Sequence, residues 1–247
     1  MLSKYVMIVL AFVAFFSIDV DGQGEIDDQD KMFYRNERTY GISLTSSGYS
    51  LNFRYGKHVT AFKKTLYMID FSEIKHPKEI KKLYQIYANS NRYAFGKQNA
   101  FFSLKAGFGK HKEVFSKKDK GGIAIRRFYT FGAALGILKP VYYQIYYRTL
   151  NSIEEEKFDA SIHRIDNIIG TASFFKGIGE ITFSPGVFVK YGYNFEFSKK
   201  DESVNALETG IIGEAYLFKA PMVADNDSRR FFINLFLTYR FGKIMGR

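Results

Sequence analysis

Long stretches of this chain alternate strictly between apolar and polar residues. In residues 181–198, which read ITFSPGVFVKYGYNFEFS, the odd positions are apolar apart from Pro185. The even positions carry mainly Thr, Ser, Gly, Lys, Asn and Glu, with Phe188 as the exception. Period-two alternation is typical of a β-strand whose two faces meet different surroundings. The function that the sequence predicts depends on whether the apolar face meets a protein core or lipid.

The same alternation recurs along most of the chain and predicts an all-β protein without a domain boundary after residue 40. Across residues 40–56 the apolar phase flips at Ser46-Ser47-Gly48, so that either one bulged strand or a hairpin fits. The other expected strands lie within residues 60–71, 100–108, 123–137, 141–147, 181–198, 204–218 and 231–241.

The N-terminal segment predicts export. Lys4 precedes the apolar run YVMIVLAFVAFF, and small residues follow at Val20 and Gly22. A basic start, a short apolar run and small residues before a cleavage point are typical of a secretory signal peptide, which we assign to residues 1–22. Residues 23–39 are acidic and poor in apolar side chains, which predicts a flexible lead-in. Residues 40–247 are then the folded domain.

One segment breaks the strand pattern. Pro77 opens a stretch in which Ile80, Leu83, Tyr84 and Tyr87 recur at helical spacing among several lysines. We therefore expect a short amphipathic helix within residues 75–90. It would either cover an end of the sheet or lie on a membrane surface.

Strand length favours lipid over a protein core. Soluble strands average about five or six residues, whereas several alternating stretches here are two to three times longer. No apolar run after the signal is long enough for a membrane helix, so a closed barrel is the structure that could span a bilayer. We therefore predict a closed antiparallel transmembrane β-barrel of about eight strands, with ten as the alternative.

The polar faces of these strands carry charged residues that would point into the barrel. Eight-stranded barrels have interiors that side chains fill, and buried charges must be paired. We therefore expect a packed polar network in place of an open pore, although a narrow pore for small solutes is an alternative. Its candidate members are Arg54, Lys105, Arg126, Glu180, Lys190, Glu196, Glu214 and Arg240.

Loop lengths predict which connections share a side of the membrane, because outer loops of such barrels are longer than periplasmic turns. Working back from the last strand, residues 219–229, 150–177, 116–122 and 57–59 fall outside. Residues 199–203, the Lys139-Pro140 turn and residues 72–97 fall inside. This assignment gives eight strands if residues 40–56 form a single strand, and the long inner segment 72–97 fits it poorly.

Composition excludes several kinds of site. There is no cysteine, so disulfides, thiolate metal sites and cysteine nucleophiles are excluded. The formal net charge of +11 either attracts anionic surfaces, which for an exported protein means lipid phosphates and not nucleic acid, or simply keeps the loops soluble. The residues predict no metal site and no cofactor.

Residues 40–247 resemble the largely uncharacterised small outer-membrane β-barrel proteins of Bacteroidota. The resemblance is carried by GYSLNFRYGK, IDFSEIKHPKEIK, FGKQNAFF and GILKPVYYQI, and by LFLTYRFGK, which is similar to the terminal strand read by the barrel insertion machinery. It implies an outer-membrane location, contact with lipids including lipopolysaccharide, and no established activity. Six residues follow Phe241, whereas many such proteins end on the aromatic residue.

The functional prediction is a non-catalytic envelope barrel that is structural or binds a ligand or partner through its loops. The alternative is a lipid-modifying enzyme, since lipid A deacylases are eight-stranded barrels with a serine and a histidine. His111 with Ser103 or Ser116 is the nearest match, and its spacing is not distinctive. The four histidines, His58, His76, His111 and His163, are expected at strand ends or in loops. The oligomeric state and the identity of a protein partner are not predicted.

Overall fold

The computed structural model describes residues 36–60, 62–79, 81–82, 92–117, 122–147, 151–200, 202–224 and 228–245. The expected signal peptide and nearly all of the expected lead-in lie outside these residues. Within the described ranges, no helix is long and apolar enough to cross a membrane.

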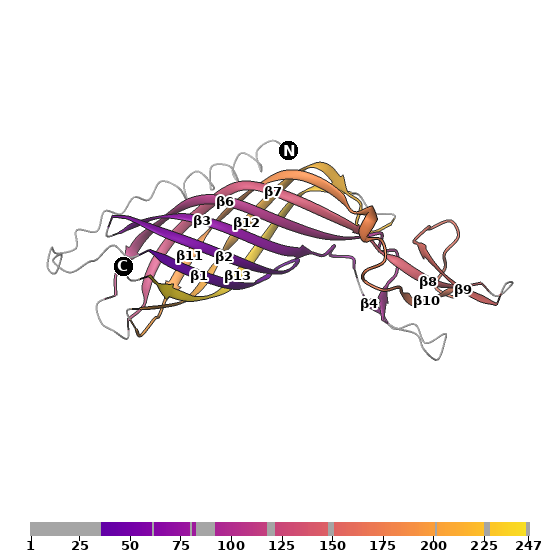
Figure 1. Ribbon diagram of the computed structural model, residues 1–247, viewed down its shortest axis with the longest axis horizontal. Coiled ribbons are helices and arrows are strands. Elements are labelled where there is room, and N and C mark those ends of the chain that lie inside the picture. Colours follow the sequence, from indigo (N-terminus) through magenta and orange to yellow (C-terminus); the bar gives the residue numbers. More distant parts are fainter. Residues whose placement is uncertain are drawn as a thin grey trace, which may run out of the picture. The chain divides into compact units, whose positions relative to one another are not determined.

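Eight antiparallel strands close into a barrel, which confirms the predicted fold class and strand count (Figure 1). Around the ring the order is β1-β13-β12-β11-β7-β6-β3-β2, and β2 pairs with β1 to close it. The barrel strands are β1 (Glu37–Thr45), β2 (Gly48–Thr60), β3 (Lys63–Ile74), β6 (Asn99–Phe115), β7 (Ala124–Pro140), β11 (Thr182–Glu196), β12 (Ser203–Ala220) and β13 (Arg229–Ile244).

The register is staggered around the ring. A line drawn across paired residues from Tyr40 on β1 reaches β13 at Phe231, whereas Tyr40 itself pairs with Phe241, ten residues further along. Closing a sheet with such a stagger requires the strands to tilt by ~35–45° to the barrel axis. The ring leaves no free sheet edge among its eight strands, so the barrel backbone satisfies its own hydrogen bonds.

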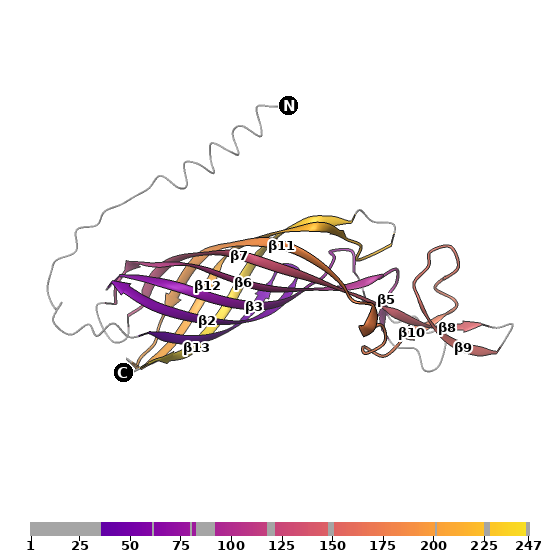
Figure 2. The same ribbon diagram turned by 45° about the horizontal axis from the view of Figure 1, so that its top comes forward.

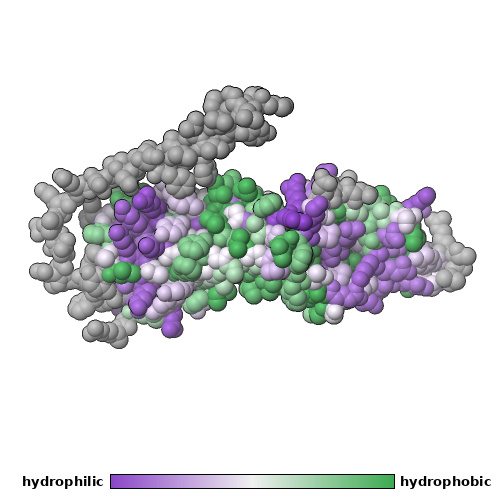
Figure 3. Space-filling view, turned by 90° about the horizontal axis from the view of Figure 1, so that it is seen from above, coloured by the Kyte–Doolittle hydropathy of each residue, from purple (hydrophilic) through white to green (hydrophobic). Residues whose placement is uncertain are grey.

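The apolar faces of the strands point outward. Val189 is 58% exposed and Leu235 63%, whereas Lys190 and Arg240 on the opposite faces are 1% exposed. On β13 the outward apolar positions span residues 231–241, which matches the ~9–11 residues that cross a bilayer. Figure 3 shows the result as a hydrophobic band between hydrophilic regions at the two ends. A soluble barrel would place these faces the other way round.

Residues 40–56 form a hairpin and not a single bulged strand. β1 and β2 pair from Thr45↔Gly48 to Glu37↔Gly56, with Ser46 and Ser47 as the turn. The phase flip seen in the sequence is therefore a chain reversal. β1 also begins at Glu37, three residues before the expected boundary at residue 40.

The prediction of a barrel strand at residues 141–147 is wrong. The chain does not turn back at Lys139-Pro140. It continues into β8 (Tyr142–Tyr147), which pairs with β9 (Ser152–Lys157) and β10 (Ile168–Thr171) in a separate sheet (Figure 2). A proline ends a strand because it has no N–H to donate, but it does not force a reversal. We call β8–β10 the projecting sheet.

The outward face expected for residues 141–147 is buried. Tyr143 and Ile145 are fully buried in a small core with Phe158 and Ile168. An alternating strand has the same appearance in sequence whether its apolar face meets lipid or a small protein core. The strand count remained eight because the added hairpin strand replaces the strand that does not cross.

This exchange inverts the side expected for every connection between residues 57 and 140. We call the end of the barrel where β1 begins and β13 ends the termini end, and the opposite end the loop end. The long segment 75–98 lies at the loop end, which removes its poor fit, and residues 61–62 and 116–123 lie at the termini end. The assignments of 150–177 and 219–229 to one end and 199–203 to the other agree with the structure.

The helix expected within residues 75–90 is absent from the part of that segment that the structure describes. Residues 77–78 form a turn, and β4 (Lys81–Lys82) pairs with β5 (Tyr93–Ala94) as a two-stranded sheet. Residues 80 and 83–91 lie outside the described ranges. The four residues that carry the helical spacing are among these, so the structure describes only the flanks of the expected helix, and the flank at Lys81–Lys82 is paired as a strand.

The prediction that the apolar band faces lipid can be tested by placing an arginine at two outward positions, one in the middle of the band and one near its edge. Val189→Arg places a charge in the middle of the apolar band and should lower the free energy of unfolding from lipid vesicles by about 2–4 kcal/mol. Val114→Arg is the matched control. Val114 also faces outward but lies on β6 beyond Lys110 and Lys112, so it should cost about 0–1 kcal/mol. Equal losses would contradict a lipid-facing band.

Candidate functional site

Glu208 on β12 is the centre of the charged network inside the barrel. Its carboxylate accepts hydrogen bonds from Arg54 (2.6 and 3.2 Å), from Arg240 (2.8 and 3.1 Å) and from the Asn194 amide (2.8 Å). These side chains come from four strands, and Glu208 is fully buried. Two guanidinium groups around one carboxylate place net positive charge here, which the surrounding polar groups must offset.

The two arginines find further partners on other strands of the ring. Arg240 donates to the Asn52 side chain at 2.6 Å and to the Thr39 hydroxyl at 3.1 Å. The Arg54 guanidinium lies over the Phe128 ring, 4.6 Å from its centroid. Such contacts between a buried cation and an aromatic face are favourable because the ring quadrupole is negative at its face.

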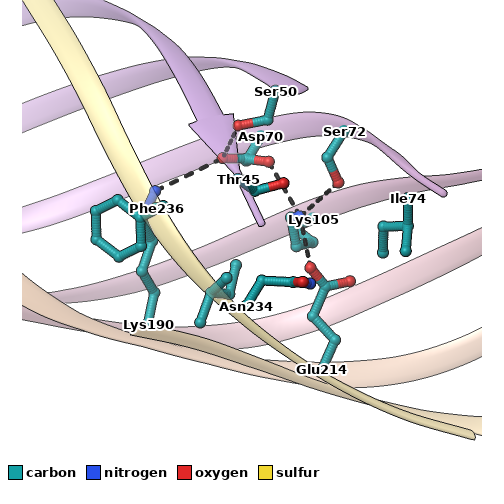
Figure 4. A pocket seen from close by; sticks show the side chains of 11 residues that line it. Thr45, Ser50, Asp70, Ser72, Ile74, Lys105, Lys190, Glu214, Asn234 and Phe236 are labelled. Carbon is teal, nitrogen blue, oxygen red and sulfur yellow. Dashed lines mark hydrogen bonds and ion pairs between the residues drawn. The ribbon is translucent and has the colours of Figure 1, made fainter. Parts of the chain in front are cut away.

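Lys105 on β6 is the centre of a second network nearer the loop end (Figure 4). Its ammonium lies 3.1 Å from Asp70 and 2.9 Å from Glu214, and it donates to the Ser72 hydroxyl at 2.7 Å. The Tyr216 hydroxyl donates to Glu214 at 2.5 Å. One lysine therefore lies between two buried carboxylates, which reverses the charge pattern around Glu208.

Lys190 belongs to the second network. It lies 3.9 Å from Asp70 and 4.2 Å from the centroid of the Phe236 ring, and Figure 4 draws it opposite Lys105 across Asp70. The cavity between these side chains has a volume of about 10 Å³. That is the size of a single water molecule, so this part of the interior has no room for a solute.

The termini end of the interior holds a third set of ion pairs. Lys64 lies 2.6 Å from Glu37, and Arg126 pairs with Glu113 at 2.9 Å and with Glu196. These side chains are buried or nearly so. Opposite charges from several strands therefore close this end of the interior by mutual attraction.

Aromatic rings fill the interior at the loop end. Phe101 lies 5.1 Å from Tyr216 and 5.3 Å from Phe232, centroid to centroid, and all three are buried. Gly136 faces this cluster, where a Cβ would come within 2.8 Å of the Phe101 ring. The absence of a side chain at that position allows the rings to pack against the barrel wall.

The structure brings together seven of the eight sequence-predicted network residues. Arg54, Lys105, Arg126, Lys190, Glu196, Glu214 and Arg240 all point into the barrel. Glu180 does not. It lies on the exposed 3₁₀ turn η2 (Ile178–Glu180), where Lys157 and the Tyr142 hydroxyl bind it and the hydrogen bond from Lys157 lowers its pKa. β11 begins at Thr182, so the alternation does not extend to residue 180.

Sequence reasoning missed several interior residues. Asp70, Glu208, Lys64 and Glu37 hold the networks together, yet the expected set did not include them. The alternation could have identified Glu208, because it lies on the same face of β12 as Glu214. The interior aromatics were missed because they interrupt the polar face, as Phe188 does on β11.

Among the described residues, His111 is not hydrogen-bonded to Ser103 or Ser116, the two serines considered as its catalytic partners. His111 is buried within β6, not at a strand end, and neither of its ring nitrogens has a hydrogen-bond partner among the described residues. Ser103 bonds the Tyr216 hydroxyl and Ser116 bonds Glu113. In the described part of the chain, no group of three or more His, Asp or Glu side chains could hold a metal ion.

The loop end carries the projecting sheet and an open depression beside it. The projecting sheet is anchored by the Tyr143 hydroxyl, which donates to the backbone of Ala94 at 2.6 Å, and burial raises the Tyr143 pKa. His163 lies 3.2 Å from Glu156, which also accepts from the Tyr147 hydroxyl at 3.1 Å. His163 and Glu156 border this open depression, which has a volume of about 750 Å³ and an acidic lining.

Comparisons with known proteins give structural likenesses only. No family model matches the chain, and no curated protein does. The attachment invasion locus protein Ail of Yersinia pestis has a TM-score of 0.41 and 8% identity, over 87% of this chain and 100% of that one. Neisserial surface protein A (NspA) has a TM-score of 0.40 and 9% identity, over 84% of this chain and 95% of that one. The structure of Ail in complex with the heparin analogue sucrose octasulfate has a TM-score of 0.37 and 9% identity, over 87% of this chain and 100% of that one.

Removing the charge of Glu208 tests the central network. Glu208→Gln leaves Arg54 and Arg240 buried without a counter-charge and should cost about 3–5 kcal/mol of unfolding free energy in lipid vesicles. Glu180→Gln is the control, because Glu180 is solvent-exposed and its loss should change stability little. Denaturant titration of both variants provides the measurement. A Glu208 variant as stable as the Glu180 variant would show that the buried network is not held by this carboxylate.

Proposed function

We propose that the mature protein is a non-catalytic barrel spanning the outer membrane of a Gram-negative envelope, after export by a cleaved signal peptide at residues 1–22. The observation that carries this proposal is the polarity of the barrel wall. Buried charges such as Arg54 and Lys105 lie inside, and large apolar side chains such as Leu235 and Val189 lie outside. In water this arrangement would expose a continuous apolar band, which soluble monomers avoid.

The filled interior supports a structural or binding role over transport. Ion pairs occupy the middle and the termini end, and aromatic rings occupy the loop end. What such a barrel can offer is a stable support for the segments at its loop end, namely the projecting sheet and the β4–β5 hairpin. We propose that these face away from the cell and bind a ligand or partner there.

The lipid and machinery partners follow from the same proposal. The outward faces would contact outer-membrane lipids, including lipopolysaccharide. The aromatic strand β13 would be the segment read by the barrel insertion machinery, as the resemblance to the Bacteroidota barrels implies. A nucleic-acid partner has no support in a membrane-facing surface of this kind.

Localisation is the first test. We expect the protein to fractionate with the outer membrane and to migrate faster on a gel when unheated than when boiled, because closed barrels resist unfolding by detergent. The comparison needs membrane and periplasmic fractions of the same cells. Recovery in the soluble periplasmic fraction would overturn the proposal.

Conductance tests the filled interior. Purified protein in planar bilayers should produce no stable single-channel steps, because ion pairs and aromatic rings fill the described interior and the cavity beside Lys105 measures only about 10 Å³. A general porin in the same bilayers serves as the positive control. Large and stable steps would favour the narrow-pore alternative and contradict a closed interior.

A further inference from the structure

The connection from the projecting sheet back to the barrel forms an ordered turn that we call the aromatic loop, residues 172–180. Its first residue is tied to the projecting sheet, since the Ala172 N–H donates to the Tyr142 carbonyl at 2.8 Å, and its last residues form the 3₁₀ turn η2, in which the Glu180 N–H donates to the Gly177 carbonyl at 3.1 Å. Gly177 adopts a left-handed conformation with φ of 80°, and a Cβ there would come within 2.7 Å of the Tyr142 ring. Glycine is therefore required for this close approach.

This ordered turn exposes two adjacent phenylalanines. Phe174 is 60% exposed and Phe175 75%, with Ile178 next to them at 47%. A soluble loop has no reason to hold three large apolar side chains in the open, because exposing them to water is unfavourable. No described segment of the chain covers them.

The aromatic loop continues the apolar band of the barrel. Phe71 on β3 stacks on Phe102 on β6 at 5.8 Å, and Phe102 contacts Phe174 edge-on at 6.5 Å. The Phe174 ring also covers Lys139 on the outer wall of β7, with 4.8 Å between the ammonium and the ring centroid. The aromatic loop therefore lies against the outside of the barrel wall, at the edge of the apolar band that is nearer the loop end.

Cationic side chains lie beside the exposed rings. Lys176 and Lys157 are about half exposed, and each lies 5.8 Å from the centroid of the Tyr142 ring. Apolar rings next to exposed lysines and an amphipathic tyrosine are the arrangement found where a protein crosses from lipid to headgroups. Lys157 pairs with Glu180 and Lys176 with Glu155, so this border is polar and carries little net charge. The partner that fits this surface is a lipid bilayer, whose acyl chains take the rings and whose headgroups meet the paired side chains and Tyr142.

We propose that the aromatic loop inserts Phe174 and Phe175 into the lipid leaflet at the loop end of the barrel. This inference rests on the proposed function, because it needs the barrel to span a membrane. The loop then fixes the base of the projecting sheet at the membrane surface. The height of the binding surface above the lipid is set by two phenylalanines and not by the barrel alone.

The composition of the chain provides a clean test, because it contains no tryptophan. Phe175→Trp creates a single fluorescent reporter at a largely exposed position. The variant is refolded into phosphatidylcholine vesicles with and without bromine on the acyl chains, since bromine quenches tryptophan only within the lipid. We expect blue-shifted emission, quenched roughly twofold by the brominated lipid and little affected by aqueous iodide.

Two matched single-tryptophan variants calibrate the result. Leu235→Trp lies within the apolar band at 63% exposure, so bromine should quench it. Ile162→Trp lies beside the projecting sheet at 56% exposure, so iodide and not bromine should quench it. Phe174→Trp repeats the test if the Phe175 variant fails to show heat-modifiable migration.

The outcomes separate the two levels of the proposal. Bromine quenching at both 235 and 175, but not at 162, supports the aromatic loop as a lipid anchor. Bromine quenching at 235 with iodide quenching at 175 overturns the anchor and leaves the membrane barrel intact, so that the rings face water or a protein partner. Absence of bromine quenching at 235 overturns the membrane barrel and the anchor with it.

Discussion

The pairing of buried charge inside the barrel is the constraint on which the rest of the structure depends. Glu208 accepts hydrogen bonds from Arg54, Arg240 and Asn194, which belong to three other strands. An isolated ion would be costly there, so the strands that supply its partners must stay in register. A one-residue slip of a strand would turn its charged side chains to the outside and its apolar side chains inward.

The same buried charges contribute more to the choice of strand partners than to the stability of the barrel. A buried ion pair contributes little compared with an apolar core of equal volume, but removing one partner is costly. The alternation of charge along the axis follows from this rule. Two arginines surround Glu208, and two carboxylates surround Lys105, with Lys190 and Asp70 between them. Each strand therefore has partners that fit one position in the ring and not its neighbours.

At the loop end, the elements outside the barrel pack around a small apolar core. The projecting sheet has its own core around Tyr143 and Ile145, and the aromatic loop beneath it returns the chain to β11. Only one residue, Val141, separates β7 from β8, so the position of the projecting sheet depends on the barrel wall.

The sequence by itself determined the fold class, most of the eight barrel strands and the faces of those strands, because period-two alternation and strand length are local properties. It identified Lys105, Glu214 and Arg240 as interior residues for the same reason. It could not distinguish an apolar face on lipid from one on a small core, so residues 141–147 were placed in the barrel and the sides of several loops were inverted. Only the tertiary structure decided these points and the partners of each charge, since residues such as Thr39 and Arg240, 201 positions apart, meet only when the ring closes.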